Sequence, residues 1–282
     1  MDLYVSDLDG TLLNSQKQLC SETIQTINDL IMKGLNFTVA TARSYESAGR
    51  LIEPLKLKLP IIVHNGVYVY DIAAGRYILE NFMNNEETIQ IIKLLKDNGL
   101  SPIIFARDKN NESKVFYKGV YNHGEEHYFN DRKANNDKRL TLVDEIHIES
   151  SLKIVSILAI DSEERLFPTY KSLMLKYDMI YHYMEDIYSK CHWLEITHRN
   201  ANKRKAVEFL KNYIGAERVV CFGDNLNDCS MFEIADSKYA VENAVDDLKK
   251  FATKVIGSND SCGVARCIKD LFEKGLQSEN TG

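Results

Sequence analysis

Short apolar runs that alternate with amphipathic helical patterns occur at both ends of this chain. Near the N-terminus, helical patterns at 21–34 and 45–55 separate strand-like runs at 3–6, 36–40 and 61–63. The alternation resumes after Thr197, with strand-like runs at 218–222, 238–241 and 254–256. A strand–helix–strand rhythm places parallel strands side by side under covering helices. Both ends therefore predict one α/β domain with a doubly wound, Rossmann-like parallel sheet.

The middle of the chain has a different pattern, in which strands follow one another with fewer helices between them. Helical patterns at 85–97 and 161–177 accompany strand-like runs at 102–106, 114–117, 153–160 and 179–184, and the polar stretch 130–139 predicts a loop. Such runs of strands are typical of an α+β module. We predict a core domain formed by 1–81 and 191–282, with a cap domain at 82–190 inserted into it.

Composition excludes several classes of function. The net charge of −6 disfavours a nucleic-acid-binding protein, which needs a positive surface. No apolar stretch reaches the length of a membrane span, and the N-terminus does not resemble a signal peptide, so we expect a cytoplasmic protein without a membrane partner. The six cysteines are scattered without C-x-x-C spacing, which predicts reduced thiols rather than a disulfide framework.

Two carboxylates follow the first predicted strand. Asp7 and Asp9 lie in the sequence Asp-Leu-Asp-Gly-Thr, directly after the run at 3–6. Ligands bind at the carboxyl ends of strands in doubly wound folds, and Gly10 permits a tight turn there. Crowded carboxylates need a cation or a shared proton, and Mg²⁺ prefers oxygen ligands. The alternative is an ordinary acidic turn.

A second acidic group follows the strand predicted at 218–222. Asp224 and Asp228 stand in Gly-Asp-Asn-Leu-Asn-Asp, with a spacing that lets both face one side of a helical turn. Asp and Asn are also common at helix starts, so capping is the alternative interpretation. Because both acidic groups come from the same edge of one sheet, we favour a metal site.

Three further segments carry polar groups that suit a phosphate. Thr41, Ala42 and Arg43 follow the strand at 36–40, where a hydroxyl and free N–H groups can hold an anion. Lys203 opens a predicted helix, a position that opposes the helix dipole and therefore suggests an anionic partner. Asn65, before Gly66, follows the strand at 61–63 and is a third polar position at this edge. The alternatives are N-capping by Thr41, surface charge for Arg43 and Lys203, and an ordinary turn at Asn65 and Gly66.

Taken together, these motifs resemble the haloacid-dehalogenase-like phosphatases, in particular the Cof-type branch with an α/β cap. The resemblance rests on five matches in the same order along the chain: 7–11, 41–43, 65–66, 223–228, and a C-terminal pattern formed by 239–244, 258–260 and 263–264. It covers essentially the whole chain and includes the position of the inserted cap.

The resemblance implies a Mg²⁺-dependent phosphatase for small phosphomonoesters such as sugar phosphates. Asp7 would be the nucleophile that forms an aspartyl-phosphate, and Asp9 the general acid and base. Metal ligands would come from Asp7, the Asp9 carbonyl and Asp224, with Asp228 in support. The implied phosphate and substrate contacts are Thr41, Ala42, Arg43, Asn65, Lys203 and Asn227.

Two other functions stay open at this point: a phosphomutase, which returns the phosphoryl group to a sugar, and a protein that binds a phosphorylated metabolite without turnover. The sequence does not identify the substrate, and either a monomer or a small homo-oligomer is compatible with it. Cap residues that could select the leaving group are Arg107, Lys118, Tyr183, Glu185 and Tyr188.

Overall fold

The computed structural model describes residues 1–186 and 189–279, and the chain divides into two compact units. The core unit consists of Met1–Glu80 and Ala201–Gly282, and the inserted unit of Asn81–Asn200. The predicted second boundary, at 190, differs from this division. Strand β11 (His192–His198) pairs on both sides with strands of the inserted unit, β9 and β10, and is therefore part of that unit.

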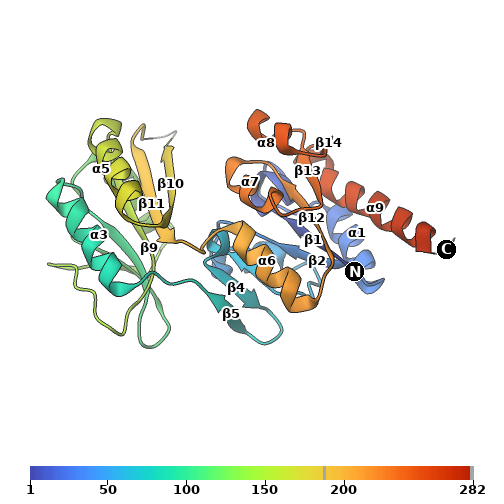
Figure 1. Ribbon diagram of the computed structural model, residues 1–282, viewed down its shortest axis with the longest axis horizontal. Helices are drawn as coiled ribbons and strands as arrows, with labels where there is room; N and C mark the ends of the chain where they lie inside the picture. Colours follow the sequence, from blue (N-terminus) through green and yellow to red (C-terminus); the bar gives the residue numbers. More distant parts are fainter. Residues whose placement is uncertain (187–188, 280–282) are drawn as a thin grey trace. The chain divides into compact units, whose positions relative to one another are not determined.

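A parallel sheet organises the core unit, as the alternating sequence pattern predicted. Within the described residues its strand order is β14-β13-β12-β1-β2, with every neighbouring pair parallel. Helices α1 and α9 lie side by side in Figure 1, and α6 lies apart from them across the strands. The elements are β1 (Asp2–Ser6), α1 (Ser21–Met32), β2 (Asn36–Val39), α2 (Tyr45–Ile52), α6 (Lys203–Ile214), β12 (Arg218–Gly223), α7 (Cys229–Phe232), β13 (Ser237–Val241), α8 (Asp246–Phe251), β14 (Lys254–Ile256) and α9 (Gly263–Glu279).

The strands at the centre of this sheet are apolar because their side chains are buried. Leu3 and Val5 of β1 and Phe222 of β12 have no exposed surface, because covering helices and neighbouring strands enclose them. Strands β1 and β12, which lie at opposite ends of the sequence, pair in parallel from Asp2–Arg218 to Ser6–Phe222. Their carboxyl ends therefore emerge side by side, and the loops that follow them start from the same edge.

The strand predicted at 61–63 does not simply continue the parallel sheet. In the structure β3 (Ile61–Val63) begins an antiparallel sheet with β4 (Tyr68–Asp71) and β5 (Arg76–Glu80). A single parallel bridge between Ala40 and Ile62 connects this sheet to β2. The main chain at 64–66 is thereby held next to the carboxyl end of β2.

The inserted unit contains a mixed sheet whose strand order in the described residues is β10-β11-β9-β6-β7-β8. Side chains from α3 and α5 pack with one face of this sheet, and side chains from α4 pack with the other. The elements are α3 (Asn85–Asp97), β6 (Ile103–Arg107), β7 (Ser113–Tyr117), α4 (His123–Ala134), β8 (Leu140–Leu142), β9 (Lys153–Asp161), α5 (Glu163–Lys176), β10 (Met179–Glu185) and β11.

Helix α4 corrects the prediction of a loop at 130–139, because it continues to Ala134. The segment is strongly polar and lacks a long apolar stripe, so its periodicity indicates no helix. Burial of Tyr128 and Phe129 against the sheet provides the stabilisation that the local sequence does not. The buried Glu125 accepts a hydrogen bond from the backbone N–H of Tyr121 (2.7 Å) just before the helix.

A disulfide bond corrects the expectation of reduced thiols. Cys20 and Cys262 are bonded, and the structure records the other cysteines as free. Cys20 precedes α1 and Cys262 precedes α9, and these two helices pack together. The fold, rather than local spacing, brings these thiols into contact. Within the described residues, no helix has the length and apolar character needed to cross a bilayer.

Candidate active site

Three carboxylates converge at the carboxyl edge of the core sheet. Asp7 directly follows β1, whereas Asp224 and Asp228 follow β12. One oxygen from each carboxylate can be chosen so that all three lie within 4.8 Å of one another. The backbone N–H of Asp7 donates to the carbonyl of Phe222 (2.9 Å), which ties the first loop to the end of β12.

Lys203 lies between two members of this cluster. Its Nζ donates to Asp7 Oδ1 (2.5 Å) and to Asp228 Oδ1 (2.6 Å), and its side chain is fully buried. The lysine begins α6, whose N-cap Asn202 accepts a hydrogen bond from the backbone N–H of Lys205 (2.8 Å). The structure thus places Lys203 with the acidic residues, although it comes from a different segment of the chain.

Because this cluster is buried, the pKa of each of its groups depends on the charges of the other members. Burial raises the pKa of Asp7 well above its usual value, Lys203 opposes that rise, and the nearby Asp228 adds to it. Burial lowers the pKa of Lys203, but Asp228 and Asp7 more than compensate and raise it. For Asp224, burial again raises the pKa. One ammonium group does not neutralise three carboxylates, so the cluster needs either a further cation or a bound proton to relieve the repulsion.

The loop after β12 is fixed by its own carboxylate. Asp228 Oδ2 accepts hydrogen bonds from the backbone N–H groups of Asp224 (2.9 Å) and Asn225 (3.1 Å), and Asp228 has no exposed surface. Its other oxygen binds Lys203. Asp228 therefore orients both Asp224 and Lys203, which explains why an acidic residue is needed four positions after Asp224.

The loop after β1 approaches Asp224 closely. Thr11 Oγ1 donates to Asp224 Oδ1 (2.8 Å), a contact that the sequence analysis did not identify. Gly10 adopts a positive φ of 74°, and a Cβ at this position would lie 2.5 Å from Asp224 Oδ2. Only glycine satisfies both conditions without displacing the carboxylate. The Gly-Thr pair after the two aspartates was the available sequence signal for this contact.

Asp9 is oriented by Arg43 instead of joining the three clustered carboxylates. Arg43 Nε donates to Asp9 Oδ2 and Arg43 Nη2 donates to Asp9 Oδ1, each at 2.6 Å. Arg43 Nη1 also donates to Ser47 Oγ (3.0 Å). The pairing with Asp9 raises the pKa of Arg43. The Asp9 side chain remains partly exposed, so it can exchange this partner for another.

The segment after β2 forms a compact turn. The backbone N–H of Thr41 donates to the carbonyl of Ile62 (2.9 Å), and Thr41 Oγ1 accepts from the backbone N–H of Arg43 (3.1 Å). Thr41 is buried, whereas Ala42 is exposed. The Thr41 hydroxyl keeps its own hydrogen for a further acceptor. This geometry is compatible with anion binding by Thr41 and by the backbone of Ala42.

The Asn65-Gly66 turn contacts two other site segments. Asn227 Nδ2 donates to Asn65 Oδ1 (3.3 Å), so these two predicted substrate residues lie together. Gly66 adopts a φ of +98°, and a Cβ there would lie 2.2 Å from the carbonyl oxygen of Asn202, the residue before Lys203. The turn is therefore packed against the start of α6, a contact that sequence spacing alone could not reveal.

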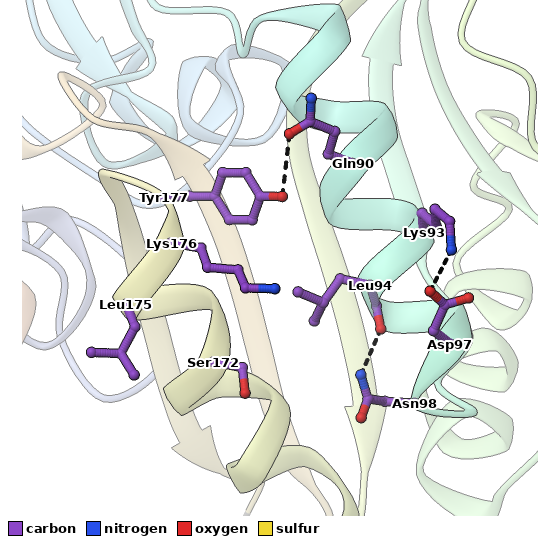
Figure 2. A pocket seen from close by; sticks show the side chains of 9 residues that line it. All are labelled: Gln90, Lys93, Leu94, Asp97, Asn98, Ser172, Leu175, Lys176 and Tyr177. Atoms are coloured by element: carbon purple, nitrogen blue, oxygen red, sulfur yellow. Dashed lines mark hydrogen bonds and ion pairs between the residues drawn. The ribbon is translucent and has the colours of Figure 1, made fainter.

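The inserted unit also carries a groove, but its lining differs in kind from the carboxylate cluster. The groove, of about 550 Å³, lies between α3 and α5 (Figure 2). Polar groups along it pair with near neighbours: Tyr177 with Gln90 (3.3 Å), and Lys93 with Asp97 (2.5 Å). None of the predicted catalytic or metal-binding residues lines it. We therefore assign the chemistry to the core unit.

The residues suggested for substrate selection are dispersed in the inserted unit. Arg107 is buried at the end of β6, and Lys118 forms an ion pair with Glu145 (3.4 Å). Tyr183 and Glu185 lie on β10, where Tyr183 stacks on Tyr170. Tyr188 lies outside the described residues. Their role in selection stays a prediction.

Comparisons with known proteins identify phosphatases that are similar to this chain over most of its length. Two similar proteins are one from Bacillus subtilis and one from Escherichia coli. The first is 5-amino-6-(5-phospho-D-ribitylamino)uracil phosphatase YitU, 27% identical over 96% of this chain and 97% of that protein. The second is pyridoxal phosphate phosphatase YbhA, 26% identical over 93% and 95% of the two chains.

Solved structures show the same fold. A haloacid dehalogenase-like hydrolase from B. subtilis aligns with a TM-score of 0.74 at 25% identity, covering 95% of this chain and 99% of that one. A protein from Eubacterium rectale aligns with a TM-score of 0.78 at 24% identity, covering 95% and 98%. The family model for haloacid dehalogenase-like hydrolases matches residues 4–268, and this chain therefore belongs to the haloacid dehalogenase-like hydrolase family.

Proposed function

We propose that this protein is a Mg²⁺-dependent phosphatase that hydrolyses small phosphomonoesters through an aspartyl-phosphate on Asp7. The observation that carries the proposal is the position of the Asp7 carboxylate. It is buried, it accepts a hydrogen bond from Lys203, and it meets Asp224 and Asp228 at one sheet edge. An ordinary acidic turn would leave such carboxylates exposed to water, because burying them apart from a positive partner is costly.

In the first step, a carboxylate oxygen of Asp7 forms a bond to phosphorus. The bond between phosphorus and the ester oxygen breaks, and Asp9 gives its proton to that oxygen as it leaves. Proton transfer by a positioned acid contributes typically about 10²–10⁴-fold to the rate. Lys203 and the Thr41 hydroxyl stabilise the negative charge that spreads over the phosphoryl oxygens.

In the second step, water attacks the phosphorus of the aspartyl-phosphate. Asp9 accepts the proton from this water, the bond between Asp7 and phosphorus breaks, and inorganic phosphate leaves. During these proton transfers, Asp9 must break at least one of its two hydrogen bonds with Arg43. We propose that Arg43 holds the Asp9 side chain next to the reacting group and releases it when substrate arrives.

The chain offers oxygen ligands that fit a hard divalent cation. We assign these ligands to the Asp7 and Asp224 carboxylates and the Asp9 main-chain carbonyl, with Asp228 orienting the loop. The excess of carboxylate over ammonium charge supports this assignment. Bound Mg²⁺ supplies positive charge that offsets the repulsion between the attacking carboxylate and the phosphate.

For the substrate we propose sugar phosphates or related small phosphorylated metabolites. Phosphatases similar to this chain are named for a ribitylamino-uracil phosphate and for pyridoxal phosphate, both of which combine a phosphomonoester with a polar organic group. A cytoplasmic location is part of the proposal. Disulfides rarely persist in that compartment. Thiol labelling after cell fractionation therefore tests both where the protein is located and whether Cys20 and Cys262 are bonded there.

The decisive experiment compares the wild type with Asp7→Asn in the presence of Mg²⁺ and p-nitrophenyl phosphate. We expect phosphate release by the wild type and a loss of at least about 10³-fold in the variant, because an amide does not replace the nucleophile. Asp2→Asn, at the other end of β1, is the matched control and should retain activity. Equal turnover by the wild type and Asp7→Asn would exclude the mechanism.

A panel of phosphorylated metabolites then separates the remaining functions. A phosphatase releases inorganic phosphate from one or more of them. Conversion of a hexose phosphate to its isomer without phosphate release would instead identify a phosphomutase. Tight binding across the panel without any turnover would identify a non-catalytic binding protein.

A further inference from the structure

Two asparagines outside the catalytic motifs hold the loop on which Asp9 lies. Asn243 follows β13 and Asn259 follows β14, so both come from the carboxyl edge of the core sheet. Asn243 Nδ2 donates to the carbonyl of Gly10 (2.7 Å), and Asn259 Nδ2 donates to the carbonyl of Leu13 (3.0 Å). We call Asn243 and Asn259 the asparagine bracket.

The members of the bracket are also bonded to each other. The backbone N–H of Asn259 donates to Asn243 Oδ1 (3.0 Å), so one asparagine orients the other. Next to them, Asp260 accepts hydrogen bonds from the backbone N–H (2.8 Å) and the hydroxyl (2.6 Å) of Ser15. The loop after β1 is thus attached to these two segments at Gly10, Leu13 and Ser15.

The same segment contacts the second acidic loop. Two residues after Asn243, the backbone N–H of Val245 donates to the carbonyl of Asp224 (2.9 Å). One short stretch, 243–245, therefore binds the loop that carries Asp9 and the loop that carries Asp224. Strand β12 lies between β13 and β1, so the bond from Asn243 to Gly10 joins loops that follow two non-adjacent strands.

Gly10 is the point at which a displacement would reach the active site. It lies between Asp9 and Thr11, and its Cα faces the Asp224 carboxylate so closely that a Cβ has no room. A main-chain carbonyl outside regular secondary structure is fixed in direction only where a protein donor binds it, since water holds it less rigidly. For Gly10 that partner is Asn243, and losing it frees the peptide next to Asp9 to rotate.

We propose that Asn243 and Asn259 are positioning residues for phosphoryl transfer: they fix the Gly10 and Leu13 carbonyls and thereby the path of the backbone that carries Asp9. The inference rests on the proposed function. It assigns a purpose to the C-terminal motifs at 239–244 and 258–260, which the two-step reaction itself does not use. A displacement of about 1 Å at a reacting group can reduce a rate by about 10²-fold.

The test uses Asn243→Asp, which keeps the shape and the acceptor for Asn259 but replaces the donor that faces Gly10 with an oxygen. Asn243→Ala removes the donor without adding charge, and Asn259→Ala removes the second contact. Asn212→Asp is the matched control, because Asn212 is exposed on α6 of the same unit. Amide hydrogen exchange of the peptide covering 7–15 is measured without substrate, and kcat and KM are measured with p-nitrophenyl phosphate and Mg²⁺.

We expect exchange in this peptide to accelerate about 10-fold in each bracket variant, and kcat to fall about 10- to 100-fold with KM within about twofold of the wild type. Asn212→Asp should match the wild type in both measurements. Unchanged exchange in folded Asn243→Asp and Asn243→Ala would overturn the inference, as would faster exchange with unchanged kcat. Wild-type protein without phosphatase activity would refute the proposed function, while exchange would still decide whether the bracket holds the loop.

Discussion

Arg43 binds both carboxylate oxygens of Asp9 through two hydrogen bonds of 2.6 Å. A planar guanidinium can form this fork, whereas the single ammonium of lysine cannot. We predict that Arg43→Lys lowers kcat about 10-fold, because Asp9 loses its fixed orientation while the local charge is retained. Steady-state kinetics with p-nitrophenyl phosphate measures the effect. Arg50→Lys, on the exposed side of α2, should leave kcat unchanged; equal kcat for Arg43→Lys and wild type would show that the pair is not used in turnover.

Mg²⁺ should stabilise the folded protein through the carboxylate cluster. A ligand present at 100 times its Kd adds about 2.7 kcal/mol to the free energy of unfolding. We predict this gain for the wild type and its absence in Asp224→Asn, whose amide can still accept the bond from Thr11. Denaturant unfolding with and without Mg²⁺ measures the difference. Asp247→Asn, on the exposed surface of α8, should respond as the wild type does. A full Mg²⁺ response in Asp224→Asn would contradict the assigned ligands.

Gly66 and Gly34 form a matched pair for testing the contact between the Asn65-Gly66 turn and α6. Their φ angles are +98° and +100°, but a Cβ on Gly66 would meet the carbonyl of Asn202, whereas one on Gly34 would meet nothing within 4 Å. Gly34→Ala should therefore lower the free energy of unfolding only by the cost of placing alanine at a positive φ, about 1–2 kcal/mol, and should keep activity. Gly66→Ala should cost about 1–3 kcal/mol more and reduce kcat, because the start of α6 carries Lys203. Chemical denaturation and kinetics of both variants test this, and equal behaviour would argue against a tight contact.

Glu125 should make the stability of the inserted unit depend on pH. Burial raises its pKa to about 7, with the nearby Asp161 raising it further and Arg165 lowering it. Between the unfolded pKa of Glu125 and pH 7, the folded state keeps a proton that the unfolded state has released. The contribution of Glu125 therefore lowers the free energy of unfolding as the pH rises through this range. Above pH 7 the full cost is present, about 3 kcal/mol, and below pH 4 it disappears.

Glu125→Gln removes this titration and can still accept the hydrogen bond from Tyr121. Denaturant unfolding of both proteins at pH 5 and pH 8 should show that the advantage of the variant grows with pH. Glu126→Gln, the exposed neighbour, serves as the control. An advantage that is constant between the two pH values would contradict the assigned shift.

The bond between Cys20 and Cys262 predicts a thiol count. Denatured, unreduced protein should react at four cysteines, namely Cys191, Cys221, Cys229 and Cys267, and at two more after reduction. Cys20→Ser should lower the free energy of unfolding by about 2–4 kcal/mol, the usual effect of removing a disulfide. Six reactive thiols in the unreduced protein would show that the pair is reduced in solution.

The sequence predicted the parallel sheet because strand and helix periodicity are local properties. It also predicted that Asp7 and Asp224 share an edge, since parallel strands end on the same side, and the structure brings them together. Their catalytic and metal-binding roles stay predictions. The pairing of Asp9 with Arg43 was not predictable, because it depends on the turn after β2.

The errors have a common physical origin in tertiary contacts. Helix α4 is stabilised by aromatic burial rather than by its own periodicity, and β11 belongs to the inserted unit because of its pairing with β9. Cys20 and Cys262 are joined across almost the full length of the sequence, which no local spacing can indicate. Similarly, the role that we propose for Asn243 depends on a contact between loops that follow two non-adjacent strands.

Because β1 pairs with β12, the carboxylate cluster cannot form until both of these strands have left the ribosome. Asp7 emerges before the inserted unit, whereas Lys203 and Asp228 emerge after it. The inserted unit is continuous in sequence, so all of its residues are made between the two halves of the cluster. Fragments that end before β12 should consequently lack phosphatase activity, because they lack Asp224 and Asp228.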